Sequence, residues 1–80
     1  SRQKESVVVN VSLLDKAFSD GETVSLETLL QKKLITVKKS EKRRVKILGD
    51  GEISKKLTIS NCVVSASDKE KIEKMGGKIV

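Results

Sequence analysis

The sequence predicts an α/β fold, a small single domain in which short strands and short helices alternate. Three observations support this class. Eighty residues correspond to one domain at most. Stretches rich in Val and Ile alternate with segments in which leucine or isoleucine recurs at helical spacing. With 36% apolar residues, no proline and Phe18 as the sole aromatic residue, the core is expected to consist mainly of Val, Ile and Leu.

The first strand and the first helix are expected before residue 22. Residues 6–11 contain four valines, which favours a strand buried on both faces. Ser12 offers an N-cap for a short helix whose apolar side includes Phe18, which is expected in the core. The Ser-Asp-Gly run at residues 19–21 is typical of a helix end followed by a turn.

The clearest helix covers residues 24–34, where leucines recur at helical spacing. Ser25 is its predicted N-cap, and the acidic Glu27 suits the positive end of the helix dipole. Lys32 and Lys33 are expected in the last turn, where positive charge is favourable.

Short strands joined by turns are expected in the central part of the chain. A brief strand at residues 35–37 leads into an exposed charged loop, and residues 45–48 alternate as a strand does. Two glycines within residues 49–51 predict a turn between strands, because glycine adopts positive φ without strain. Alternation at residues 56–60 predicts a further strand, and the apolar run at 62–66 either continues it or starts another one after a possible break at residues 60–61.

A third helix and a last strand are expected at the end of the sequence. Ser67 and Glu70 have the spacing of a capping box. Ile72 and Met75 are the predicted inward positions of this helix. Gly76 is expected in the left-handed conformation that ends helices, and the final three residues favour a strand.

Positive charge is concentrated between residues 32 and 56. This window holds ten bases and three acids, a net charge of +7, whereas the whole chain carries +6. A patch of this sign favours polyanionic partners, and a solvated surface that serves solubility is the alternative. The candidate RNA-binding residues are its ten bases: Lys32, Lys33, Lys38, Lys39, Lys42, Arg43, Arg44, Lys46, Lys55 and Lys56.

The glycine pattern does not predict a nucleotide-binding loop. Gly49, Gly51 and Ser54 lack the third glycine of the dinucleotide fingerprint and the spacing of a P-loop. A strand pattern follows instead of a helix N-terminus, and Asp50 and Glu52 would repel phosphate. A carboxylate pair on a turn is usually solvated, so we expect no acid–base site there.

Enzymatic chemistry, metals and cofactors are not expected. The chain has no histidine to activate Cys62, which lies in an apolar run and is expected to be a small core residue. One cysteine without histidine does not form a zinc site or an intramolecular disulfide, which fits a reducing compartment. No apolar run reaches the roughly 18 to 20 residues of a membrane span.

Nucleic-acid binding would rest on charge and shape. With one aromatic residue there is no platform for stacking unpaired bases, so folded RNA is favoured over loose strands. The expected contacts are from Lys and Arg to phosphates. Lys55 and Lys56 would join them if the strands around the glycine turn lie close together. The strongest candidates are Lys38, Lys39, Lys42, Arg43 and Arg44.

Two runs, residues 46–60 and 65–77, resemble the C-terminal half of large-subunit ribosomal protein fifteen, the L-fifteen family. The shared pattern is a lysine, two aliphatic residues, G-x-G, spaced apolar residues, a Ser-rich helix start and G-G. The resemblance extends over residues 7–80. Its matching positions are Lys46, Ile47, Leu48, Gly49, Gly51, Ile53, Leu57, Ile59, Ser65, Ser67, Ile72, Gly76 and Gly77.

The resemblance implies a structural constituent of the large ribosomal subunit that binds large-subunit ribosomal RNA and supports subunit assembly. It implies irregular strand–strand–helix turns, neighbouring ribosomal proteins as partners, and a cytoplasmic or organellar ribosome. Residues 1–6 would be a flexible remnant of the family's Gly- and Arg-rich extension, which is absent here. Residues 7–80 would be the globular domain, with a basic loop at 38–46, and the isolated domain is expected to be a monomer.

Two features depart from the family pattern. Residues 61–64 read NCVV where the family has a basic residue or histidine and an aromatic residue, which puts RNA contacts from this stretch in doubt. Asp68 stands where the family favours alanine, and an acid at the start of the last helix is electrostatically favourable. The alternative function is a protein–protein interaction module without direct RNA binding, which a pull-down with and without ribonuclease would distinguish.

Overall fold

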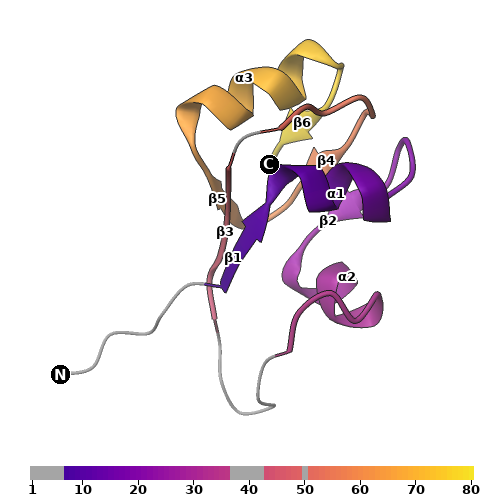
Figure 1. Cartoon of the computed structure of the whole chain (residues 1–80), viewed down its shortest axis with the longest axis vertical. Helices are drawn as coiled ribbons and strands as arrows, with labels where there is room; N and C mark the ends of the chain where they lie inside the picture. Colours follow the sequence, from indigo (N-terminus) through magenta and orange to yellow (C-terminus); the bar gives the residue numbers. More distant parts are fainter. Residues whose placement is uncertain (1–6, 37–42, 50) are drawn as a thin grey trace, which may run out of the picture.

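The computed structural model describes residues 7–36, 43–49 and 51–80, and within them the chain forms six strands and three helices (Figure 1). This confirms the predicted α/β class, while residues 1–6 and most of the basic loop 38–46 lie outside the described residues. The elements are β1 (Val7–Asn10), α1 (Val11–Ala17), β2 (Thr23–Val24), α2 (Leu26–Gln31), β3 (Val45–Leu48), β4 (Thr58–Ile59), β5 (Cys62–Val64), α3 (Ala66–Lys74) and β6 (Lys78–Ile79).

Successive strands alternate between two parallel sheets. Sheet A has the strand order β1-β3-β5, and sheet B has the order β2-β4-β6. The chain therefore winds in three successive turns, each of which adds one strand to each sheet. Helix α1 connects the two strands of the first turn and α3 connects those of the third. In the middle turn, the described residues between β3 and β4 form no helix.

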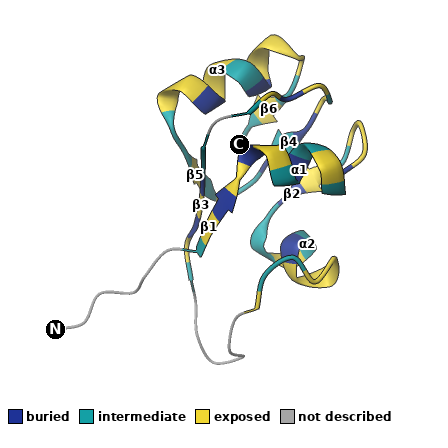
Figure 2. Ribbon diagram, in the orientation of Figure 1, coloured by how far each residue is buried: buried dark blue, intermediate teal, exposed yellow. Residues whose placement is uncertain are grey.

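The core is aliphatic and lies between the two sheets and the inward faces of the helices (Figure 2). In sheet A, Val9 on β1 pairs with Ile47 on β3, and in sheet B, Val24 pairs with Ile59. Phe18 is 1% exposed, which confirms its predicted core position. The buried apolar residues are Val9, Val11, Leu14, Phe18, Val24, Leu29, Val45, Ile47, Ile53, Leu57, Ile59 and Ile72.

Helix α1 begins earlier than the sequence predicts. Asn10, and not Ser12, is the N-cap, because its side-chain oxygen accepts a 2.8 Å hydrogen bond from the backbone N–H of Ser12. Val11 is fully buried and belongs to the helix instead of the strand. The expected burial of β1 on both faces is also wrong, since Val8 is 59% exposed.

Helix α2 confirms the predicted N-cap Ser25 and places Glu27 in the first turn. Thr28 completes a capping box, since its hydroxyl accepts a 2.9 Å hydrogen bond from the Ser25 backbone N–H. The expectation that two lysines occupy the last turn is wrong. The helix ends at Gln31, Lys32 is its C-cap, and Lys33 adopts a left-handed φ of 60°.

Helix α3 is capped by Ser65, and the predicted capping box from Ser67 to Glu70 is wrong. The Ser65 hydroxyl donates a 2.7 Å hydrogen bond to the buried carboxylate of Asp68. A helix that began at Ser67 would lack this bond, so the start at Ser65 is more favourable. Ile72 is fully buried as predicted, whereas Met75 is 41% exposed and does not point inward. Gly76 has the predicted left-handed conformation, with φ of 90°.

Strand β3 has the expected bounds, β4 and β5 are shorter than expected, and the described residues of the strand expected at 35–37 form none. Residues 35 and 36 form no strand, and residue 37 lies outside the described part. Strands β3, β4, β5 and β6 confirm the other predictions, although β4 covers only Thr58–Ile59. The glycines at 49 and 51 have the expected positive φ, 119° and 139°, but they do not make a hairpin, because β3 and β4 belong to different sheets.

Gly49 and Gly77 are required by close packing. A Cβ at Gly49 would lie 2.6 Å from the side-chain nitrogen of Asn10, the cap of α1. A Cβ at Gly77 would lie 2.8 Å from a methyl group of Ile72 and would also meet the carbonyl oxygen of Leu57. Glycine at these positions lets α1 and β4 approach the neighbouring turns of the chain.

Candidate nucleic-acid interface

The ten candidate bases do not form one group in the structure. Lys38, Lys39 and Lys42 lie outside the described residues. The other seven are divided among three places: directly before and on β3, after the end of α2, and on the connection between β3 and β4. Some of these side chains are exposed to solvent, whereas others make contacts within the chain.

Arg44 and Lys46 lie along the middle strand of sheet A. Arg44 directly precedes β3 and Lys46 lies on it, and both are exposed. The side chains of a strand alternate, so residues two apart point to the same side, about 6.6 Å from each other. Val45 and Ile47 point the other way, into the core. The outer side of β3 therefore presents two cations in sequence.

Two exposed valines flank Lys46. Val8 on β1 and Val63 on β5 are its direct neighbours in the parallel register. Val8 is 59% exposed and Val63 is 42% exposed. The run of valines in the sequence hides this row, because it favours burial of β1 on both faces; a strict two-residue alternation places Val8 outward.

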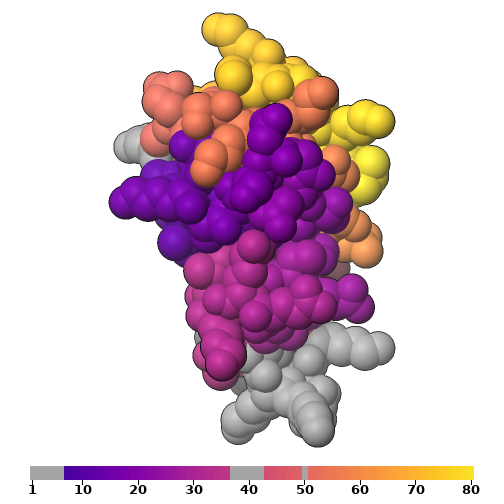
Figure 3. All heavy atoms as spheres, turned by 90° about the vertical axis from the view of Figure 1, so that its right-hand side faces the viewer, coloured from indigo at the N-terminus to yellow at the C-terminus, as the bar shows by residue number. Residues whose placement is uncertain are grey.

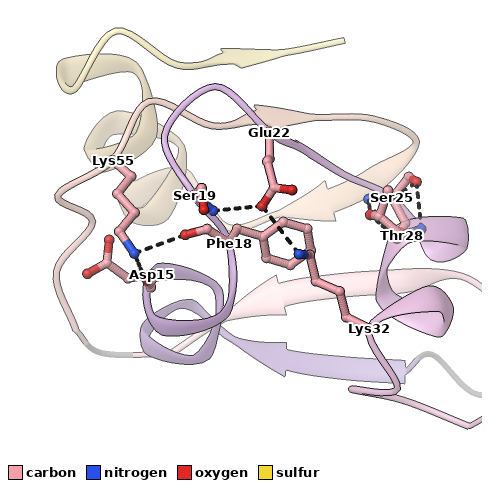
Figure 4. Close-up of polar contacts among 8 residues, drawn as sticks. All are labelled: Asp15, Phe18, Ser19, Glu22, Ser25, Thr28, Lys32 and Lys55. Carbon is pink, nitrogen blue, oxygen red and sulfur yellow. Dashed lines mark hydrogen bonds and ion pairs between the residues drawn. The ribbon is translucent and has the colours of Figure 1, made fainter.

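The Lys32 side chain contacts Glu22 and the ring of Phe18 (Figure 4). Its ammonium lies 3.3 Å from a carboxylate oxygen of Glu22 and 4.9 Å from the centre of the Phe18 ring. A hydrogen bond from the Ser19 backbone N–H, together with Lys32, outweighs desolvation and lowers the pKa of Glu22. Lys33, next along the chain, is exposed.

Lys55 contacts the C-terminal end of α1 (Figure 4). Its ammonium donates hydrogen bonds to the carbonyl oxygen of Asp15 and, at 2.9 Å, to that of Phe18. Carbonyls at a helix end lack helical partners and carry partial negative charge, so a lysine stabilises them. The backbone N–H of Lys56 donates to the carboxylate of Asp20 at 2.5 Å, and its side chain is exposed.

The connection between β3 and β4 is fastened to both neighbouring helices. The Asp15 carboxylate on α1 accepts hydrogen bonds from the backbone N–H of Ser54 at 2.8 Å and from its hydroxyl. These bonds lower the pKa of Asp15 against its partial desolvation. On the other side, Lys71 on α3 donates to the carbonyl of Gly51 at 2.6 Å. Figure 3 shows this segment lying against α1.

Arg43 lines a shallow groove between α2 and the start of β3. Polar groups on the groove wall come from Thr23, Ser25 and Asn61, and Glu27 also contributes to it. Asn61 has a left-handed φ of 55°, so its backbone is held in a conformation that few residues other than glycine adopt. The groove thus combines an arginine, the acidic Glu27 and uncharged hydrogen-bonding groups.

The described residues contain no constellation for catalysis. Burial raises the pKa of the half-buried Cys62 thiol to about 11, so the nucleophilic thiolate is scarce at neutral pH. Glu52 is exposed, and its neighbour Asp50 lies outside the described residues. No cluster of three metal-ligating side chains occurs within residues 7–36, 43–49 and 51–80. Among these residues, no helix has the length and apolarity to cross a membrane.

The fold and its surface define a small parallel α/β domain with exposed basic residues. Residues 8–80 match the model of a ribosomal protein family whose description includes the 50S proteins L15 and L18e and a protein of the 60S subunit. The chain belongs to this family. The family's members are ribosomal proteins, which agrees with the expectation that the chain is not an enzyme.

Relatives named large ribosomal subunit protein uL15 are similar over nearly the whole chain. The protein of Treponema denticola is 51% identical over 78 residues, which are 98% of this chain and 50% of the relative. That of Aquifex aeolicus is 51% identical over 76 residues, 95% of this chain and 48% of the relative. That of Kosmotoga olearia is 45% identical over 75 residues, 94% of this chain and 49% of the relative. The chain thus spans about half the length of these relatives.

Proposed function

We propose that this chain is a structural constituent of the large ribosomal subunit that binds large-subunit ribosomal RNA and supports subunit assembly. Membership of the ribosomal family supports the first part of this proposal. Neighbouring ribosomal proteins are its further partners. The named relatives are bacterial, which favours a ribosome in a bacterial cytoplasm, and they give no support to the organellar alternative.

The observation that carries the RNA-binding part is the exposed pair Arg44 and Lys46 on the outer side of the middle strand of sheet A. Neither side chain belongs to the contacts that fasten the connection between β3 and β4. In contrast, Lys55 serves the end of α1 and Lys32 pairs with Glu22. The other exposed candidates, Lys33 and Lys56, would add longer-range attraction. Lys38, Lys39 and Lys42 remain candidates from the sequence.

Binding to phosphates releases counterions, so affinity must fall as salt rises. The test is the affinity of the chain for a transcript of large-subunit ribosomal RNA between about 50 and 200 mM salt. We expect the logarithm of the association constant to fall by about 0.7 to 0.9 per phosphate contact for each tenfold rise in salt. The double variant Arg43→Glu and Arg44→Glu should bind more weakly while retaining the circular dichroism of the parent chain. An affinity that does not change with salt would contradict the proposal.

The second candidate function is a protein-interaction module, favoured by the exposed apolar side chains of Leu30 and Met75. Recovery of bound partners with and without ribonuclease treatment separates the two functions. Partners that remain bound after complete RNA digestion would support the protein module. Partners that are released with the RNA would support ribosomal RNA binding.

A further inference from the structure

The outer face of sheet A carries a three-residue row that mixes one cation with two aliphatic side chains. Val8, Lys46 and Val63 lie side by side on β1, β3 and β5, so the row crosses the whole sheet. Neighbouring strands are separated by about 4.8 Å, which places the two valines about 10 Å apart with the lysine between them. All three side chains are exposed.

A parallel sheet with one face that the described residues leave uncovered is unusual. Parallel sheets in folded proteins normally have both faces covered. The inner face of sheet A is covered, because Val9, Val45 and Ile47 are at most 2% exposed. Within the described residues, the outer face keeps two exposed valines in register on either side of Lys46, which makes it a candidate surface for contact with another molecule.

The chemistry of the three strands indicates which kind of partner suits this face. None of β1, β3 and β5 contains an acidic residue, while Lys46 lies at the centre and Arg44 directly precedes β3. This charge favours an anionic partner. No aromatic side chain is present in these strands, so stacking on unpaired bases is excluded as the means of binding.

We infer that the outer face of sheet A docks on the shallow minor groove of a ribosomal RNA helix, with Lys46 and Arg44 on phosphates and with Val8 and Val63 on the riboses. This inference rests on the proposed function and assigns the RNA-binding face. The minor groove of A-form RNA is wide and shallow and is recognised mainly by shape. An aliphatic row with a central cation suits that surface, because the cation can meet phosphates while the valines meet the sugars.

The charged and apolar parts of this contact have different signatures. Replacing the lysine by glutamine removes one phosphate contact and should lower the salt slope of binding by about 0.7 to 0.9. The double variant Val8→Ser and Val63→Ser removes apolar contact and should lower affinity about tenfold with an unchanged slope. The control Val80→Ser changes an exposed valine, 71% exposed, that lies outside sheet A, and should bind like the parent chain.

The experiment measures binding of a large-subunit ribosomal RNA transcript by the parent chain and these variants. If the parent chain does not bind, the proposed function fails, and this inference with it. If the parent chain binds with the expected salt dependence but the valine double variant binds equally well, only the inference about sheet A fails. Unfolding curves establish that each variant is folded.

Site-specific crosslinking in assembled large subunits identifies the occupant directly. A photoreactive amino acid is introduced in place of Val63, and the control carries it in place of Val80. We expect position 63 to crosslink to ribosomal RNA. A crosslink from position 63 exclusively to a ribosomal protein would overturn the inference and assign the face to a protein partner, as would the absence of any crosslink above that of an unassembled chain.

Discussion

The ammonium group of Lys71 donates a 2.6 Å hydrogen bond to the carbonyl oxygen of Gly51, which joins α3 to the connection between β3 and β4. The same ammonium lies 4.0 Å from Asp68, a carboxylate that is 1% exposed. One oxygen of that carboxylate, Oδ1, has no hydrogen-bond partner within the described residues. Lys71 thus serves two elements, because it fastens the middle turn of the chain and offsets a buried negative charge.

Replacing Lys71 by methionine should destabilise the fold. The change removes the hydrogen bond to Gly51 and leaves the Asp68 carboxylate without a nearby cation, so we expect a loss of about 2 kcal/mol in the free energy of unfolding. Urea unfolding monitored by circular dichroism measures it. The matched control is Lys74→Met, an exposed lysine in the last turn of the same helix. Equal stabilities of the two variants would show that the contact contributes nothing.

Asp15 should make the stability of the fold depend on acid pH. Its pKa is lowered in the folded state, mainly by the backbone N–H of Ser54. The folded state therefore binds fewer protons than the unfolded state. The ionised Asp15 carboxylate contributes its full stabilisation above the pKa that Asp15 has in the unfolded chain, and this stabilisation is lost as the pH falls through the lower pKa of the folded chain. Since the carboxylate is partly solvated, we expect Asp15→Asn to cost about 1 kcal/mol at neutral pH.

The measurement for Asp15 is the free energy of unfolding of the parent chain and the variant from neutral pH to below about pH 4. The two curves should converge at the acid end. Glu70→Gln, a change of an exposed acid on α3, is the control and should not alter the pH profile in this way. A constant difference between parent and Asp15→Asn at all pH values would contradict this role of the carboxylate.

Gly77 should tolerate a side chain far less than Gly21 does. A Cβ at Gly77 would lie 2.8 Å from Ile72 and would also meet the backbone of Leu57, whereas a Cβ at Gly21 meets nothing within 4 Å. We expect Gly77→Ala to cost about 3 kcal/mol through overpacking. Gly21→Ala should cost about 1 kcal/mol, because its φ of 91° strains alanine. Thermal unfolding compares the two, and a larger loss for Gly21→Ala would refute the packing account.

Cys62 should react slowly with alkylating reagents. Burial raises the pKa of its thiol to about 11, so at pH 8 its thiolate is about a hundredfold rarer than that of a free cysteine. Labelling by iodoacetamide, followed by mass spectrometry, should be slower by that factor in the folded chain and should recover in denaturant. Labelling of the folded chain at the rate of a free thiol would contradict the burial of this side chain.

The sequence predicted the α/β class and the main helix because those features depend on local patterns. The Ser25 cap is local and was confirmed. The leucine spacing is also local and predicted the helix, although Leu30 is 38% exposed and Leu34 lies beyond the end of α2. The starts of α1 and α3 were predicted two residues late. In each case a nearby side chain, Asn10 or the pair of Ser65 and Asp68, makes a cap whose advantage depends on burial and on hydrogen-bond geometry.

The sorting of strands into two sheets could not be predicted from local pattern. The Gly49–Gly51 segment has the composition of a hairpin turn, and only the three-dimensional course of the chain places β3 and β4 in different sheets. The same applies to the basic residues. Lys46 and Lys55 look alike in the sequence, but one lies on an exposed sheet face and the other contacts the end of α1.

The central claim is that exposed bases of β3 and its start bind ribosomal RNA. The most direct test compares two charge-matched double variants, Arg44→Gln with Lys46→Gln, and Lys69→Gln with Lys74→Gln on α3, for salt-dependent binding to a large-subunit ribosomal RNA transcript. The account predicts that the first double variant lowers the salt slope by about 1.4 to 1.8, corresponding to two lost phosphate contacts. The double variant on α3 should bind with the same salt slope as the parent chain. Equal slopes for the two variants would contradict the claim.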